Sequence, residues 1–108
     1  TVKKFLPSAY GTLMSANDAQ FLTHLMSQVV EIGTGSAMRG ASYTVAGKTG
    51  SAEFETGKET HSWFVGFAPA DKPKVAICVL AEESGSGGAV AAPIARQVLD
   101  RYFAKYGQ

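Results

Sequence analysis

Three stretches typical of β-strands follow one another in the middle of the chain, with only short turns between them. Short turns join antiparallel neighbours, whereas a parallel pair needs a crossover of about a dozen or more residues. The sequence therefore predicts a three-stranded antiparallel meander. The strands are expected at residues 44–54, 61–68 and 74–82, with turns at 55–58 and 69–73.

The third stretch is apolar at every position from 75 to 80. An unbroken apolar run is typical of a strand that is covered on both faces. Cys78 lies within this run, and we expect it to be a small buried side chain. Because it is the one cysteine of the chain, an internal disulfide and a cysteine-cluster metal site are excluded.

Apolar residues spaced by three and four positions predict a helix over about residues 17–32. Ser15, followed by Asp18, resembles the capping pair that begins a helix, and Gly33 is suited to the left-handed conformation that ends one. The apolar face consists of Phe21, Leu22, Leu25, Met26, Val29 and Val30. We expect Phe21 and Met26 to be core residues.

A second helix is predicted from about residue 90 to residue 106. Apolar side chains recur there every four residues, and charged residues lie between them. Pro93 fits only in the first turn, so the helix is expected to begin near residues 89–92. The order is therefore helix, three antiparallel strands, helix, which is an α+β fold. The recurring side chains are Val90, Ile94, Val98 and Tyr102.

The charge balance argues against a dedicated nucleic-acid binder. Ten basic and nine acidic residues give the 108-residue chain a formal charge of +1, without the basic patch that nucleic acid requires. Neither a stretch of about 20 apolar residues, long enough to span a bilayer, nor a secretory signal pattern occurs. The chain begins at Thr1 without Met, so we expect it to be a piece of a longer protein.

The stretch Gly47-Lys48-Thr49 resembles part of a phosphate-binding loop. Such a loop needs a glycine five positions before Gly47, and that position is Ser42. The loop must also lead into a helix, whereas the residues after Thr49 continue a strand. Both tests fail, so the sequence argues against nucleotide binding.

Lys48-Thr49-Gly50 on a strand beside a cleft gives a different interpretation. A lysine ammonium can attract an anionic substrate and set the protonation of its neighbours. Hydroxyls of Thr49 or Ser51 can bind a carboxylate, and Gly50 lets a substrate backbone come close. A strand N–H can stabilise a developing oxyanion.

Four stretches carry a resemblance to a known family. They read VVEIGTGSA, VAGKTGSAE, HSWFVGFAPAD and GGAVAAPIARQVLDRYF, in that order. Together they resemble the C-terminal part of the penicillin-binding protein transpeptidase domain, in the serine β-lactamase and penicillin-binding superfamily. The resemblance covers about residues 15–104 and is strongest to the class B, monofunctional group. It implies a partial β-lactamase/transpeptidase-like fold.

The resemblance implies a serine acyl-transferase of cell-wall synthesis that needs no cofactor. In this family a serine of a Ser-x-x-Lys motif attacks the D-Ala-D-Ala end of a peptidoglycan stem peptide, and β-lactams acylate the same serine. Lys48 would place its charge beside the substrate carboxylate, and Thr49 would donate its hydroxyl to it. Gly50 would give clearance. The Ser51 N–H would form half of the oxyanion hole, so Lys48 and Ser51 are the catalytic candidates.

The other two family motifs are missing from the chain. No serine is followed by lysine three positions on, and the nearest match, Ser36 to Arg39, has arginine instead. Ser15-Ala16-Asn17 spells Ser-x-Asn but is expected to cap a helix. The resemblance therefore implies that residues 1–108 are the C-terminal segment of a transpeptidase domain. Because the N-terminal part with the nucleophile is absent, we expect the chain alone to be inactive.

Several alternatives stay open. A D,D-carboxypeptidase, a serine β-lactamase or a penicillin-sensor domain would share the fold, and a non-catalytic binding or assembly module is the alternative from another class. The resemblance also implies a membrane-anchored parent protein on the extracytoplasmic face of a bacterial membrane. The chain by itself is expected to self-associate through an uncovered sheet face.

The remaining polar candidates are expected to be structural. Two histidines far apart give no metal site, so His24 is interpreted as a solvated helix residue and His61 as a structural one. Three carboxylates near the first turn are interpreted as solvated. They are Glu53, Glu55 and Glu59.

Overall fold

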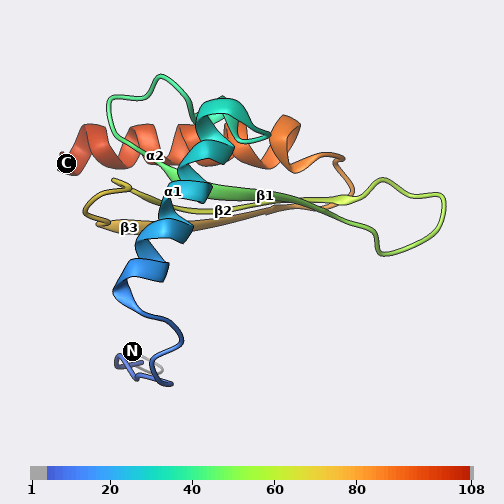
Figure 1. The fold of residues 1–108 in the computed structure, drawn as a ribbon. Helices are drawn as coiled ribbons and strands as arrows, with labels where there is room; N and C mark the ends of the chain where they lie inside the picture. Colours follow the sequence, from blue (N-terminus) through green and yellow to red (C-terminus); the bar gives the residue numbers. More distant parts are fainter. Residues whose placement is uncertain (1–4, 108) are drawn as a thin grey trace.

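The computed structural model describes residues 5–107 and has the α+β order predicted from the sequence (Figure 1). Along the chain, one α-helix precedes the meander of three strands and the other follows it. One short helical turn follows α1, and another precedes α2. The elements are α1 (Ala16–Ile32), η1 (Ser36–Met38), β1 (Ala46–Ala52), β2 (His61–Ala68), β3 (Val75–Ala81), η2 (Gly87–Ala91) and α2 (Ala92–Tyr106).

The sheet has the strand order β1-β2-β3, and both strand pairs are antiparallel. The predicted meander is therefore confirmed. Lys48 lies opposite Val65, which lies opposite Cys78, so these three residues share one row and one face. Thr49 lies opposite Phe64 on the other face.

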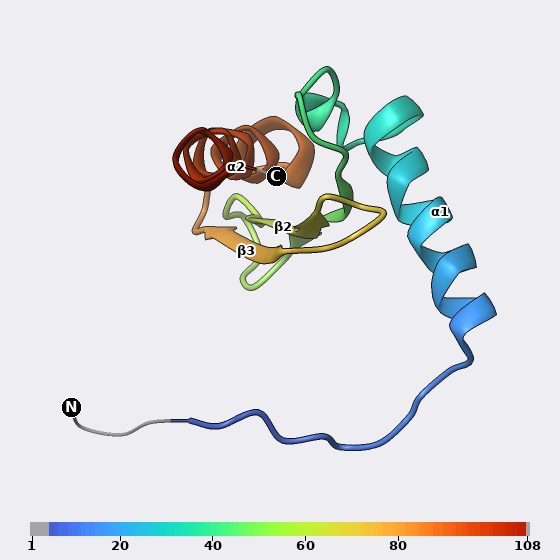
Figure 2. The same cartoon turned by 90° about the vertical axis from the view of Figure 1, so that its left-hand side faces the viewer.

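Helix α2 covers one face of the sheet and forms the core with it (Figure 2). Phe64 of β2 and Leu99 and Phe103 of α2 are buried there. Tyr43, from the loop before β1, packs on Phe103 with ring centroids 4.4 Å apart. Burial of such side chains contributes roughly 1.5–3 kcal/mol each, so this layer is the main source of stability.

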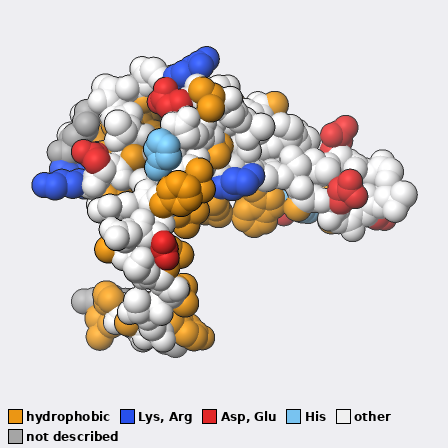
Figure 3. Space-filling view, viewed as in Figure 1, with side chains coloured by type: hydrophobic (Ala, Val, Ile, Leu, Met, Phe, Trp, Pro, Cys, Tyr) orange, Lys and Arg blue, Asp and Glu red, His pale blue; other side chains and the backbone are white. Residues whose placement is uncertain are grey.

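The other face of the sheet is open within residues 5–107. Exposure alternates along β3, and Leu80 is 45% exposed. The predictions that this strand is covered on both faces and that Cys78 is buried are therefore wrong, because Cys78 is exposed. The space-filling view shows hydrophobic side chains gathered below the sheet and on the segment before α1 (Figure 3).

Helix α1 lies beside β1 and extends past the sheet (Figure 2). Its predicted bounds are confirmed to within one residue, and Ser15 caps it by accepting the Asp18 N–H at 3.1 Å. The core prediction is wrong for Phe21, which is 63% exposed, and Met26 is half-buried. The physical reason is that the first half of α1 extends past the sheet, where every side chain from residue 16 to residue 24 except Thr23 is exposed.

Gly33 ends α1, but in extended backbone rather than the predicted left-handed conformation (φ −118°, ψ −156°). A Cβ there would lie 2.9 Å from the Val29 carbonyl oxygen. Lack of space, not backbone conformation, therefore accounts for this glycine. Pro93 lies in the first turn of α2, as predicted. No helix within residues 5–107 has the length and apolar character needed to cross a membrane.

Candidate active site

Strand β1 carries all four of the residues predicted for the site, but on two faces. Thr49 and Ser51 face the side that α2 covers, whereas Lys48 and Gly50 face the open side, because side chains alternate along a strand. Lys48 is exposed, and its ammonium donates a hydrogen bond to the Thr49 carbonyl oxygen. β1 is an edge strand. A ligand could therefore contact both the Thr49–Ser51 face and the Lys48–Gly50 face only along the unpaired edge of β1.

The Thr49 hydroxyl is held by Thr34, in the loop between α1 and η1. The two hydroxyl oxygens are 2.5 Å apart, and Thr49 is 7% exposed. When one hydroxyl donates to the other, the acceptor keeps its own proton for a further partner. Either hydroxyl can be the donor, and the Thr49 proton is available to a ligand in the arrangement in which Thr34 donates.

The Ser51 hydroxyl is held by η2. Its oxygen accepts the Gly87 N–H at 3.3 Å, and the side chain is exposed. Since the oxygen acts as acceptor in this bond, the hydroxyl proton is free to be donated outward. Thr49 and Ser51 thus lie on one face of β1, each with an oxygen held by a neighbouring loop.

The two glycines of the site have different surroundings. A Cβ on Gly47 would lie 2.5 Å from the ring of Phe64, so Gly47 makes room for an aromatic ring and not for a phosphate. A Cβ on Gly50 would meet only Trp63, at 3.6 Å, which is an ordinary contact. Packing among residues 5–107 therefore does not require glycine at position 50.

Sequence reasoning assigned no role to Thr34 or Gly87, although both lie in the stretches that carried the family resemblance. Thr34 lies 15 residues before Thr49, and Gly87 lies 36 residues after Ser51. Only the fold brings them together. Residue spacing gave no signal of either contact.

The residues interpreted as structural have structural contacts. His61 stacks on Phe54 with centroids 4.1 Å apart, and its Nδ1 accepts the Glu83 N–H at 3.1 Å. Lys58 lies 3.5 Å from carboxylate oxygens of both Glu55 and Glu83, at the exposed turn. In the part of the chain that the structure describes, no three metal-ligating side chains form a cluster.

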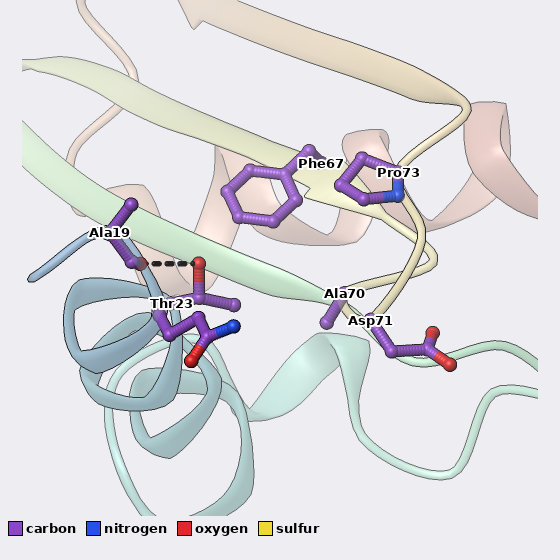
Figure 4. A pocket seen from close by; sticks show the side chains of 7 residues that line it. Ala19, Thr23, Phe67, Ala70, Asp71 and Pro73 are labelled. Atoms are coloured by element: carbon purple, nitrogen blue, oxygen red, sulfur yellow. Dashed lines mark hydrogen bonds between the residues drawn. The ribbon is translucent and has the colours of Figure 1, made fainter. Parts of the chain in front are cut away.

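A groove of about 600 Å³ lies apart from the four site residues. It runs between α1 and the β2–β3 turn, where Thr23 faces Phe67 and Pro73 (Figure 4). Thr23 donates its hydroxyl to the Ala19 carbonyl at 2.9 Å. The groove offers one charged side chain, Asp71, and no arrangement for acyl transfer.

A polar cluster fixes the loop that leads into β1. The Tyr43 hydroxyl donates to Asp100 at 2.6 Å, and Arg96 Nε lies 3.0 and 3.1 Å from the two oxygens of that carboxylate. Arg96 also donates to the carbonyls of Ala37 and Arg39. Burial raises the pKa of Tyr43, and the hydrogen bond to Asp100 raises it further. The hydrogen bond from Tyr43 lowers the pKa of Asp100, and Arg96 lowers it further.

We expect Tyr43→Phe to lower the free energy of unfolding at neutral pH by about 1 kcal/mol, the net value of one hydrogen bond. The pKa of Asp100 is lower in the folded state. The stability that the ionised Asp100 carboxylate contributes is therefore present above the pKa of Asp100 in the unfolded state, and it is lost as pH falls through the pKa of Asp100 in the folded state. Urea unfolding should show the difference from wild type shrinking at strongly acidic pH. A difference that stays constant would contradict this account.

The order of elements and the Lys48-Thr49-Gly50 strand define the chain as part of a transpeptidase-like α+β domain. A family model described as penicillin binding protein transpeptidase domain matches residues 7–100. The chain belongs to this family, as the resemblance implied.

Two of the relatives are peptidoglycan D,D-transpeptidases by name. The chain is 40% identical over 85 residues to the peptidoglycan D,D-transpeptidase MrdA of Haemophilus influenzae, covering 65% of this chain and 13% of the relative. It is 36% identical over 109 residues to the peptidoglycan D,D-transpeptidase PbpA of Mycolicibacterium smegmatis, covering 92% and 22%. The chain thus spans less than a quarter of either relative.

Solved structures agree with the fold. The D,D-transpeptidase domain of a peptidoglycan glycosyltransferase from Eggerthella lenta matches with a TM-score of 0.77 and 33% identity, over 95% of this chain and 24% of that one. Penicillin-binding protein A from M. tuberculosis, as an imipenem acyl-enzyme complex, matches with a TM-score of 0.71 and 38% identity, over 83% and 20%.

Proposed function

We propose that this chain is the C-terminal segment of a peptidoglycan D,D-transpeptidase, and that β1 forms one wall of its acyl-transfer site. The observation that carries the proposal is the arrangement of Thr49 and Ser51. Their hydroxyls lie on one face of an edge strand, and Thr34 and Gly87 hold the oxygens. Two such hydroxyls next to a lysine suit the carboxylate of a peptide terminus or of a β-lactam.

In the proposed reaction, a serine elsewhere in the domain attacks the carbonyl of the penultimate D-Ala of a stem peptide. An ester bond to the serine forms, the peptide bond breaks, and D-Ala leaves with the proton. An amine of a neighbouring stem then attacks the ester carbonyl, an amide bond forms, the ester bond breaks, and the serine oxygen regains a proton from the amine. Lys48 attracts the terminal carboxylate, Thr49 and Ser51 donate to it, and the Ser51 N–H stabilises the oxyanion. The parent protein is proposed to lie at the outer face of the bacterial membrane.

The isolated chain is expected not to form a covalent adduct with a fluorescent penicillin, because the Ser-x-x-Lys nucleophile is absent from its sequence. The intact protein should be labelled at one site per molecule. Gel fluorescence and intact mass measure both. Stoichiometric labelling of the isolated chain would overturn the role given to the missing part, and an unlabelled intact protein would favour a non-catalytic binding module.

The isolated chain is also expected to self-associate. Val65, Cys78 and Leu80 form an exposed apolar area on the open sheet face, and such areas promote association. Light scattering over a concentration series should show a rising mean mass. The matched variants Val65→Thr and Leu80→Thr should lower it, and a monomer at high concentration would contradict this expectation.

A further inference from the structure

The Ser62 side chain is fully buried in β2, and both hydrogen-bonding functions of its hydroxyl are used. It is 0% exposed, donates to the Ser86 carbonyl at 2.8 Å, and accepts the Ala91 N–H at 3.0 Å. A hydroxyl enclosed in a sheet costs free energy unless it is bonded in this way. Ser62 lies directly opposite Ser51 in the strand register.

The two partners of Ser62 stand at the two ends of η2. Ser86 is the residue before this turn, and Ala91 is its last residue. Between them lies Gly87, whose N–H donates to the Ser51 hydroxyl. Ser62 therefore fixes both ends of η2, and η2 in turn holds the Ser51 hydroxyl.

The contact between η2 and the sheet is close at Gly87. A Cβ on Gly87 would lie 2.4 Å from the Trp63 carbonyl oxygen and 2.5 Å from the Gly50 carbonyl oxygen. Both neighbours are backbone atoms of paired strands, so they cannot move aside cheaply. The position of the Gly87 N–H thus depends on how η2 is fastened to β2.

We propose that Ser62 is a positioning residue for the candidate active site, acting through η2 on Ser51. By fixing η2, it makes the Ser51 oxygen an acceptor for Gly87 and directs the Ser51 proton toward the substrate carboxylate. The inference rests on the proposed function, in which Ser51 binds that carboxylate. Thr60 separately holds the loop between β3 and η2 by donating to the Gly85 carbonyl, at 2.9 Å, so loss of Ser62 should loosen η2 without detaching this loop.

The test compares acylation of the intact protein by benzylpenicillin and by its methyl ester, which lacks the charged carboxylate. Ser62→Ala should slow acylation by the free acid about three- to tenfold, the value of one hydrogen bond, and leave the ester rate within about twofold. Ser51→Ala should discriminate in the same way. The double variant should be no slower than Ser51→Ala alone, because Ser62 acts through Ser51.

Two further variants make the result decisive. Tyr43→Phe removes a hydrogen bond far from η2, so its free-acid to ester ratio should equal that of wild type. Ser62→Cys keeps the shape with a weaker hydrogen-bonding group, and should fold and show the same discrimination if Ser62→Ala does not fold.

Equal losses for acid and ester, or additive losses in the double variant, would overturn the role of Ser62. If Ser51→Ala discriminates and neither Ser62 variant does, the proposed function stands and this inference fails. If Ser51→Ala itself does not discriminate, both the carboxylate role of Ser51 and this inference fail.

Discussion

Lys48→Ala in the intact protein is expected to slow acylation by β-lactams about 10²-fold, the size of effect found when a preorganised stabilising group is removed from a site. The Lys48 ammonium lies against the backbone of Thr49, at the edge strand where the ligand carboxylate is proposed to bind. Its loss removes a fixed positive charge from that place. Stopped-flow or gel-based rates of acylation at several drug concentrations measure the effect.

The matched control is Lys58→Ala. Lys58 is an exposed lysine of the β1–β2 turn, paired with Glu55 and Glu83. Lys58→Ala changes the net charge of the protein by the same amount as Lys48→Ala, so a general electrostatic effect would slow acylation of both variants equally. An acylation rate for Lys48→Ala equal to that of Lys58→Ala would refute the role of Lys48.

Gly87→Ala is expected to destabilise the protein by about 1–3 kcal/mol, the cost of overpacking, and also to slow acylation. The added methyl would overlap the carbonyl oxygens of Trp63 and Gly50. Either η2 lifts from the sheet or β1 shifts beside the site, and in both cases the Gly87 N–H leaves the Ser51 hydroxyl. Urea unfolding and benzylpenicillin acylation measure the two effects.

Gly57→Ala is the control for losing a loop glycine. Gly57 has a φ of +82° and nothing within 4 Å of a Cβ, so alanine there costs about 1–2 kcal/mol in backbone strain alone. That variant should lose stability and keep its acylation rate. Gly87→Ala with unchanged acylation would separate η2 from the function of Ser51.

The order of elements could be predicted because local patterns carry it. The bounds of β2 agree with the prediction, and the capping role of Ser15 was read from four residues. Patterns of this kind depend on neighbours in the chain. They report which segment forms a strand or a helix, whatever packs against it.

The packing contacts between the elements could not be predicted from the sequence. The apolar run containing Cys78 indicated a strand buried on both faces. Hydrophobic side chains indicate only that burial is favourable, not that other residues of this chain bury them. Gly33 could not be assigned to a tight contact with Val29, since the same residue type also suits a left-handed cap. The bonds that hold Thr49 and Ser51 connect segments distant in sequence, so only the fold shows them.

The ring of Phe64 lies against two glycines, Gly47 and Gly66, that face each other across β1 and β2. One large side chain thus fills the volume that three medium ones would share. Positions 47 and 64 should therefore vary together among related proteins, because a side chain at position 47 requires a smaller residue at position 64. A side chain at position 66 would also lie 2.8 Å from the Ala46 carbonyl oxygen, so Gly66 is required whatever stands at position 64. The first glycine of Gly-Lys-Thr-Gly would then be under selection from the core, whereas the residues after it would be under selection from the proposed ligand.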